Sequence, residues 1–381
     1  MSAMYLNEEH EIFRRSFRKF LEKEAYPYYE QWEENRIIPR EFWLKMGEQG
    51  FLCPDLDEKY GGSGVDWGFS VIINEELERV GSGLIGIGLH NDIVIPYISS
   101  FGTDSQKQKW LPRCATGEII TAIAMTEPGT GSDLASIKTT AKLEGEHYIV
   151  NGQKTFITNG IHADLIIVAC KTNPDAVPAH KGISLLAIER GALGFTRGRK
   201  LNKVGLHCQD TAELIFEDCI VPKENLIGQE GQGFQFMMEK LQQERLIVAI
   251  AAQVASEEML KMTIDYVKTR QAFGRSISQF QNTQFKIAEI ATDVEMGRTF
   301  LDQLITEHMN GKDVVTKVSM AKWKLTENAR KIAVECMQLH GGYGYMEEYE
   351  IARRYRDIPV ASIYAGTNEI MKTIIAKNIG L

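Results

Sequence analysis

The spacing of hydrophobic residues changes twice along this 381-residue chain. Up to about residue 118, apolar side chains such as Phe13 and Phe17 recur at three- and four-residue steps, which predicts amphipathic helices. Short β-rich runs follow, and helical spacing then returns and continues to the end. We therefore expect an α+β protein with an N-terminal helical domain (1–118), a middle β-barrel-like domain (119–228) and a C-terminal four-helix bundle (229–381).

The middle region contains six short runs that predict strands: Ile119–Met125, Tyr148–Val150, Lys154–Thr158, Leu165–Ala169, Ile183–Ile188 and Ala212–Phe216. Asn151-Gly152 separates two of them and is the dipeptide that a two-residue hairpin turn favours, because both turn positions need positive φ. No long helical pattern lies between these strands. A doubly wound nucleotide-binding fold is therefore disfavoured.

One carboxylate falls on an apolar helix face in the C-terminal region. At helical spacing, Glu244 shares a face with Met237, Leu241 and Ile247. Such surroundings disfavour the ionised form and raise the pKa of a carboxyl, which suits a general base. The alternative is a structural ion pair with Arg245 or another cation.

Composition narrows the possible partners and compartment. The net charge is −8, and no Lys/Arg stripe interleaved with aromatic residues occurs, so a nucleic-acid partner is disfavoured. No apolar run reaches about 18 residues, and no signal or transit pattern is visible, so we expect no membrane span and a cytoplasmic location. The six cysteines form no Cys-x-x-Cys motif. They predict reduced, packed thiols with neither a disulfide framework nor a metal site.

Two motifs in the middle region could hold a ligand. Met125–Asp133 combines glycines, a proline and hydroxyls after a strand, and its backbone amides could line a polar cofactor or a phosphate ester. It lacks the third glycine and the following helix of a dinucleotide fingerprint, and a plain structural turn is the alternative. Phe156 and Thr158 alternate onto one strand face, where a ring and a hydroxyl could meet a planar ligand. Core packing is the alternative there.

Three glycine-containing segments interrupt the C-terminal helices: Arg270–Gly274, Gln338–Gly344 and Tyr364–Glu369. Glycine turns beside an arginine and amide side chains would suit a pyrophosphate and an adenine. His340 fits a structural histidine better than a catalytic one, because the eight histidines allow no Ser/His/Asp or Cys/His arrangement.

Taken in this order, the motifs MTEPGTGSD, FITNG, RQAFG, QLHGGYG and IYAGTNE resemble the acyl-CoA dehydrogenase family of flavoproteins over essentially the whole chain. The resemblance implies FAD-dependent α,β-dehydrogenation of acyl-CoA thioesters to trans-2-enoyl-CoA. It also implies FAD bound between subunits of a homotetramer, and electron-transferring flavoprotein as the electron acceptor.

The resemblance also implies site residues. Those expected to bind the cofactor are Ile123, Met125, Thr126, Ser132, Phe156, Thr158, Arg270, Phe273, Gln281, Gln338, Leu339, Gly341, Gly342, Gly344, Thr367 and Glu369. Those expected to bind the substrate are Ser132, His180, Gln242, Gln243, Arg245, Ala365 and Gly366. The cofactor residues from Arg270 onward would reach the FAD of a neighbouring subunit.

The chain departs from many family members at Ala365, where those members carry the catalytic glutamate. In the long-chain and isovaleryl branches the base is instead on the first helix of the C-terminal domain, and Gln243-Glu244-Arg245 matches that pattern. Glu244 is thus the expected base. The Ala365 amide, with a ribityl hydroxyl of FAD, would stabilise the enolate oxygen.

The substrate is expected to be a long-chain acyl-CoA, with branched-chain acyl-CoA as the alternative. An acyl-CoA oxidase is a rival on the same scaffold, but such chains normally carry a further C-terminal domain. A catalytically silent flavin- or CoA-binding assembly protein is a second rival. The flavin motifs together with Glu244 argue against it.

Overall fold

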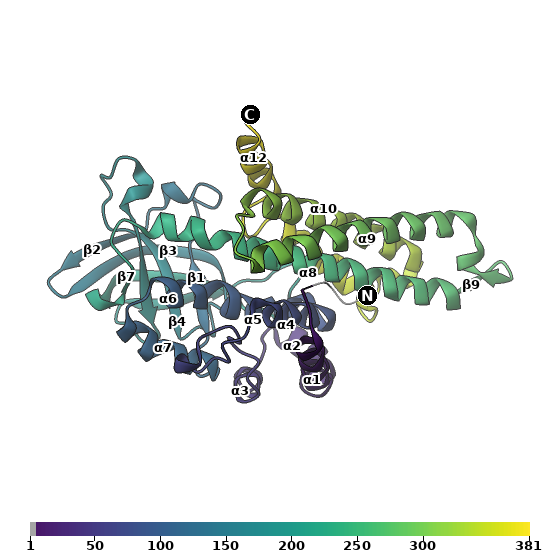
Figure 1. Cartoon of the computed structure of the whole chain (residues 1–381), viewed down its shortest axis with the longest axis horizontal. Coiled ribbons are helices and arrows are strands. Elements are labelled where there is room, and N and C mark those ends of the chain that lie inside the picture. Colours follow the sequence, from purple (N-terminus) through teal and green to yellow (C-terminus); the bar gives the residue numbers. More distant parts are fainter. Residues whose placement is uncertain (1–4) are drawn as a thin grey trace.

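The computed structural model describes residues 5–381 and has three parts (Figure 1). N-terminal helices cover one side, a β-sheet domain forms one end, and long C-terminal helices extend away from it (Figure 1). The expected α+β architecture is confirmed. Helical, β and helical parts follow one another along the chain.

The N-terminal part is helical, as its periodicity predicts. Asn7 caps the first helix, since its side chain accepts from the His10 N–H at 3.1 Å while the His10 ring accepts from the Asn7 N–H. The helices are α1 (Glu8–Glu24), α2 (Tyr29–Asn35), α3 (Arg40–Glu48), α4 (Trp67–Val80), α5 (Ile85–Gly88), the π-helical turn η4 (Leu89–Val94), α6 (Ile95–Phe101) and α7 (Asp104–Ala115). Of these, α2 was not expected.

One stretch of this part, Ser82–Phe101, is long and apolar enough to cross a membrane by length and composition alone. Of its most apolar window, 67% is buried inside the protein. A core helix passes the same test, so this stretch is weak evidence for a membrane span.

Helix α4 lies between the N-terminal and C-terminal helices and is buried along most of its length. Its Glu75 carboxylate accepts 2.8 Å hydrogen bonds from Arg14 of α1 and from Arg298 of α9 (Gln281–Met309). These ion pairs join the two helical parts across α4. They fix the position of α4 between these two parts.

The middle part forms a single sheet. Its strands are β1 (Thr121–Ala124), β2 (Thr140–Glu144), β3 (His147–Thr158), β4 (Leu165–Lys171), β5 (Ile183–Glu189), β6 (Phe195–Lys200), β7 (Thr211–Pro222) and β8 (Leu226–Ile227). The hydrogen-bonded order is β6-β7-β3-β2-β4-β5-β8, with β1 paired to β4. Strands β2 and β6 were not recognised in the sequence, because their outward-facing positions carry charged residues.

The prediction of a hairpin turn at Asn151-Gly152 is wrong. Strand β3 runs through both residues, and the register against β7 shifts between Val150 and Gly152. The Asn151 side chain exchanges hydrogen bonds of 2.8 and 3.0 Å with Asp218 of β7. Because a Cβ on Gly152 would lie 2.5 Å from Thr139 Oγ1, the glycine permits a bulge with close packing.

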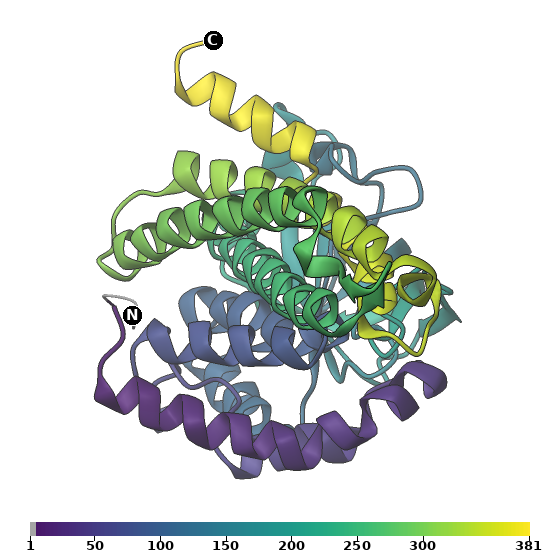
Figure 2. The same cartoon turned by 90° about the vertical axis from the view of Figure 1, so that its right-hand side faces the viewer.

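The C-terminal part contains the long helices α8 (Gly233–Thr269), α9 and α10 (Val315–His340), with α11 (Glu350–Asp357) and α12 (Asn368–Asn378). A short hairpin of β9 (Gln271–Ala272) and β10 (Arg275–Ser276) joins α8 to α9. Helix α10 packs along α8, and α12 packs on α10 and projects from the body in both views (Figures 1 and 2).

Candidate active site

Glu244 lies in the fourth turn of α8, where the helix passes the N-terminal part. Its carboxylate is half-buried and forms neither a hydrogen bond nor an ion pair within residues 5–381. Burial raises the pKa of the Glu244 carboxyl to about 7, against the opposing charges of Arg245 and Lys322. The structural ion pair that was the alternative is not formed, and the carboxylate is left able to accept a proton.

The wall beside Glu244 comes from α6 and from the π-helical turn before it. The Tyr97 hydroxyl is buried without a hydrogen-bond partner, and burial together with the Glu244 charge raises the pKa of Tyr97. The Gln243 side chain donates to the carbonyl oxygen of Asp92 at 2.8 Å. Burial also raises the pKa of the Asp92 carboxyl to about 7. Glu244 is therefore held in a desolvated setting.

The turn after Tyr364 approaches the same region. Ala365 and Gly366 have φ values of 55° and 86°, so two consecutive residues are left-handed. A Cβ placed on Gly366 would lie 3.9 Å from Nη2 of Arg245, the residue after Glu244. The tertiary fold thus brings together Glu244, Arg245, Ala365 and Gly366, which are about 120 positions apart in the sequence.

Thr367 ends this turn as the cap of α12, and its hydroxyl accepts from the Ile370 N–H at 3.3 Å. Glu369 is exposed in the first turn of the same helix. Both were expected to contact the cofactor. The structure gives Thr367 a local structural role as well.

A buried ion pair between Lys154 and Glu127 stabilises the loop that follows β1. Lys154 Nζ donates to Glu127 Oε1 and to the Met125 carbonyl oxygen, each at 2.9 Å, and Lys154 is fully buried. The Glu127 carboxylate also accepts from the N–H groups of Lys138 and Thr139. This pair, which the sequence analysis missed, fixes the backbone of the loop.

The expected ligand residues in and next to this loop differ in exposure. Ser132 is exposed, Met125 and Thr126 are half-buried, and Ile123 and Met125 pack against the core that contains Met237 of α8. The Thr126 carbonyl accepts from the Thr155 N–H at 3.0 Å, so the loop lies along β3.

Phe156 leaves its strand in an unusual way. Its φ is 60°, it lies at a register shift between Lys154 and Ile157, and its side chain is 68% exposed. The bulge, rather than simple alternation, turns the ring outward. Thr158 is half-buried two residues later. An uncovered aromatic ring beside a hydroxyl fits a planar aromatic ligand, and core packing of Phe156 is excluded.

A second group of expected cofactor residues forms one cleft of about 430 Å³ at the far end of α8. Its lining is Tyr266, Arg270, Ile277, Gln338, Leu339, His340, Gly341, Gly342, Tyr343 and Met346. A Cβ on Gly341 or Gly342 would meet no atom within 4 Å, and the Arg270 guanidinium lies over the Tyr343 ring. Open backbone beside an arginine fits a pyrophosphate.

Three further residues of this group differ in position. Phe273 is 95% exposed in the β9–β10 turn, and Gln281 is exposed at the start of α9. Gly344 is buried, where a Cβ would lie 2.4 Å from the Met337 carbonyl oxygen. Gly344 therefore shapes the cleft floor rather than lining it. His340 Nδ1–H donates to the Cys336 carbonyl oxygen at 2.8 Å, and the ring stacks on Tyr266, as a structural histidine does.

The two groups of residues do not meet within one chain. Glu244 is in α8 and Arg270 caps the C-terminal end of that helix, and at a rise of about 1.5 Å per residue they are about 39 Å apart along its axis. His180 lies near the start of α8, with its ring 5.1 Å from that of Phe234. Gln242 is half-buried next to the Glu244 turn.

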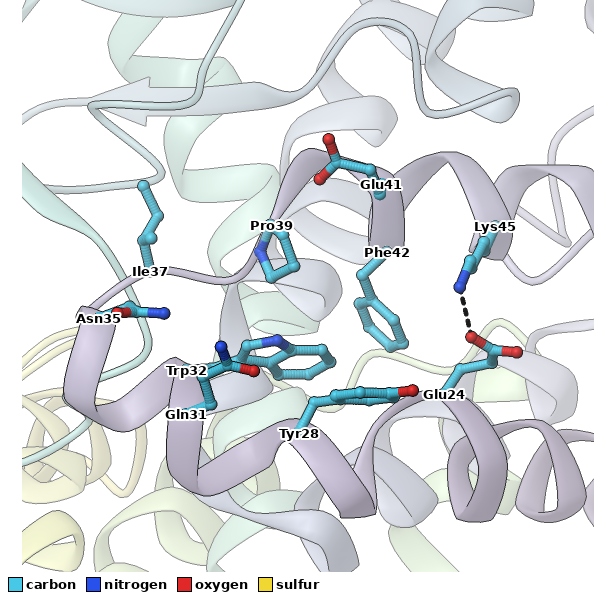
Figure 3. A pocket seen from close by; sticks show the side chains of 10 residues that line it. All are labelled: Glu24, Tyr28, Gln31, Trp32, Asn35, Ile37, Pro39, Glu41, Phe42 and Lys45. Carbon is cyan, nitrogen blue, oxygen red and sulfur yellow. Dashed lines mark hydrogen bonds and ion pairs between the residues drawn. The ribbon is translucent and has the colours of Figure 1, made fainter.

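Another cavity, of about 310 Å³, lies among α1, α2 and α3 (Figure 3). Tyr28, Trp32 and Phe42 form its aromatic wall, and Lys45 pairs with Glu24 at its edge (Figure 3). None of the expected site residues lines it. It is separate from the Glu244 region.

Within residues 5–381, no group of three or more His, Cys, Asp or Glu side chains could hold a metal ion. The six cysteines are all free and buried, as expected for reduced, packed thiols.

Sequence models of the family cover nearly the whole chain. The Acyl-CoA dehydrogenase N-terminal, middle and C-terminal domain models match residues 7–118, 122–219 and 231–380. The order of a helical, a β and a helical part, each matched by its family model, places the chain in a class of flavin-dependent oxidoreductases. The chain belongs to the acyl-CoA dehydrogenase family, and its cofactor is FAD.

Individual relatives agree with this assignment. The long-chain specific acyl-CoA dehydrogenase of Sus scrofa is 46% identical over 372 residues, which are 97% of this chain and 86% of that protein. The isovaleryl-CoA dehydrogenase of Pongo abelii is 36% identical over 98% of this chain and 89% of that protein. The crystal structure of an acyl-CoA dehydrogenase from Geobacillus kaustophilus is 69% identical, with a TM-score of 0.99 over 100% of both chains.

Proposed function

We propose that this acyl-CoA dehydrogenase acts on long-chain fatty acyl-CoA, with Glu244 as its catalytic base. The observation that carries the assignment of the base is the setting of Glu244: a desolvated carboxylate with no hydrogen-bond or ion-pair partner among residues 5–381, followed by Arg245, which approaches the Ala365–Gly366 turn. A carboxyl whose pKa is near 7 can both remove and hold a proton at neutral pH.

In this proposal Glu244 removes the pro-R α-proton of the thioester. The negative charge that develops on the thioester oxygen is stabilised by the N–H of Ala365, a residue with left-handed backbone in the turn before α12. Bound FAD supplies the acceptor for the β-hydride. Gln242, Gln243 and Arg245 line the acyl and thioester region, and the His180 loop faces the nucleotide end of the CoA.

The FAD site is proposed to be shared between subunits. Ile123, Met125, Thr126, Ser132, Phe156 and Thr158 hold the ring end, and the Arg270 cleft holds the pyrophosphate and adenine of a partner's FAD. The separation of about 39 Å along α8 supports this, because it is longer than an extended flavin dinucleotide. A homotetramer with such shared sites follows the family pattern. We propose that reoxidation is by electron-transferring flavoprotein and that the enzyme is cytoplasmic, in keeping with its six free thiols.

The preference for long chains is supported by the higher identity to the long-chain relative than to the isovaleryl relative. Branched-chain acyl-CoA is the second candidate, because the base is on the same helix in that branch. A series of straight acyl-CoA thioesters of increasing length, with isovaleryl-CoA added, tests the choice by anaerobic bleaching of the flavin. Faster bleaching by isovaleryl-CoA or butyryl-CoA than by palmitoyl-CoA would refute the long-chain assignment.

A further inference from the structure

Lys322 of α10 is a fully buried lysine that the sequence analysis did not single out. Its Nζ donates to the Gly366 carbonyl oxygen at 2.7 Å and to the Asn368 side-chain oxygen at 3.2 Å. The Thr326 hydroxyl, one turn further along α10, donates to that same Asn368 oxygen at 3.1 Å. Both acceptors of the lysine thus belong to the short segment that carries Ala365.

The charge of this lysine is not balanced by a carboxylate. Lys322 makes no ion pair with any residue of the described chain, 5–381, whereas the other fully buried lysine, Lys154, is paired with Glu127 at 2.9 Å. Burial lowers the pKa of Lys322 to about 8, with Arg245 adding to the effect, so the side chain is still a cation at pH 7. An unpaired buried cation is costly, and its hydrogen bonds must compensate for that cost.

The turn that it contacts is one that needs support. Ala365 is left-handed without being glycine, which costs about 1 kcal/mol. The Gly366 carbonyl belongs to the Gly366–Thr367 peptide, so a hydrogen bond to its oxygen restricts the backbone on the C-terminal side of the Ala365–Gly366 turn. The direction of the Ala365 N–H depends on the same few dihedral angles.

We propose that Lys322 is a positioning residue of the dehydrogenation: its ammonium group holds the Ala365–Gly366 turn by hydrogen bonds, and its positive charge favours the ionised form of Glu244. The proposal rests on the function proposed above. Lys322 touches neither substrate nor cofactor in it. It acts through the Ala365 amide and through the Glu244 carboxylate.

Charged and titratable groups on the surrounding elements decide whether the pKa of Glu244 rises or falls. Arg245 on α8 and Lys322 on α10 stabilise its ionised form, while Tyr97 on α6 lies near it and Asp92 is buried on the adjoining turn. Glu369 of α12 acts on Lys322 rather than on Glu244. Because Lys322 favours the carboxylate, removal of its charge raises the pH at which Glu244 becomes an effective base.

The test compares Lys322→Met and Lys322→Arg with Lys324→Met, an exposed lysine of the same helix, in the FAD-loaded enzyme. In Lys322→Met we expect amide hydrogen exchange in residues 363–368 to be at least about tenfold faster, because the hydrogen bonds from Lys322 to Gly366 and Asn368, here called the clamp, are lost. We also expect the midpoint of the pH profile for anaerobic flavin reduction by palmitoyl-CoA to move up by about one pH unit. Lys322→Arg retains the charge and keeps the wild-type midpoint, and Lys324→Met changes neither measurement.

An amide hydrogen-exchange rate in residues 363–368 of Lys322→Met equal to that of the wild type would overturn the role of the clamp. A wild-type pH midpoint for flavin reduction would overturn the electrostatic effect on Glu244. If Lys322→Met does not fold, Lys322→Gln, which is neutral but keeps a donor, takes its place in the pH comparison with the same expected shift. Failure of the proposed function is distinguishable, because then no acyl-CoA bleaches the wild-type flavin. The exchange comparison is still decisive for the clamp in that case.

Discussion

Glu244 is in α8 and Arg270 is the residue that caps the C-terminal end of the same helix, so the two lie about 39 Å apart along it at the usual rise per residue. Glu244 is next to the Ala365 turn, while Arg270 borders the glycine-lined cleft at the other end. If both contribute to FAD-dependent chemistry, they serve different FAD molecules. This relationship leads directly to a test with two inactive variants.

Co-expression of Glu244→Gln and Arg270→Ala subunits should restore activity that neither variant has alone. Random pairing makes half of the subunit pairs mixed, and each mixed pair holds one intact site, so about a quarter of wild-type activity is expected. Flavin reduction by palmitoyl-CoA measures it. The control is two separately purified proteins mixed without subunit exchange, and no recovery in co-expressed hybrids would contradict a shared site.

Glu244→Gln should keep its FAD and its assembly but lose flavin reduction by about 10²–10⁴-fold, because an amide cannot accept the α-proton. Single-turnover anaerobic bleaching measures the loss. Glu239→Gln, an exposed carboxylate on the same helix, is the matched control and should reduce its flavin at the wild-type rate. Near-normal bleaching in Glu244→Gln would require another base.

The pH dependence of kcat/KM should show the titration of Glu244 in the free enzyme. The base must be ionised, and burial raises its pKa to about 7, so kcat/KM should rise through pH 7 and level off above it. Steady-state assays with palmitoyl-CoA from pH 5.5 to about 9 measure this rise. A profile already flat from pH 5.5 would argue that the carboxylate is solvated.

Stability should depend on the same group in the opposite direction. The folded Glu244 pKa, about 7, is above its model value of 4.5, so the folded state holds the proton more tightly than the unfolded state does. The resulting stability is fully present below pH 4.5 and is lost as the pH rises through 7.

Glu244→Gln removes this dependence. It should therefore be more stable than wild type at pH 8, by about 1–3 kcal/mol and about 2–4 °C in Tm, with the difference shrinking toward pH 5. Thermal unfolding of the substrate-free holoenzyme at the two pH values measures it. An equal difference at pH 5 and pH 8 would show that the effect is not one of ionisation.

Lys154→Met should weaken FAD binding, although Lys154 itself is not one of the expected ligand residues. It leaves Glu127 buried with no cation, which costs about 3–5 kcal/mol, and frees the Met125 carbonyl from its hydrogen bond. A lower Tm and faster FAD release, followed by flavin fluorescence, are expected. Lys142→Met, an exposed lysine of the adjacent strand, is the control. Equal FAD release in the two variants would exclude this role for the buried pair.

Much of the architecture could be read from the sequence, because hydrophobic spacing reports local geometry. The order of helical, β and helical parts and the apolar face of Glu244 follow from periods of 3.6 and 2. Local rules failed where a contact distant in sequence took precedence. At Asn151-Gly152 the preferred turn gave way to a bulge held by Asp218 and by packing against Thr139.

The candidate site divides in the same way. The sequence by itself determined that Glu244 is a carboxylate on an apolar stripe, and that Ala365 leaves the other family position without one. Only the tertiary structure decided that Glu244 has no ion partner in the described part of the chain, that Arg245 approaches Gly366, and that Lys322 reaches the Gly366 carbonyl. Periodicity places a side chain on one face of its own element. Which groups of other elements surround it, and hence its pKa, depends on packing between segments that are distant in the chain.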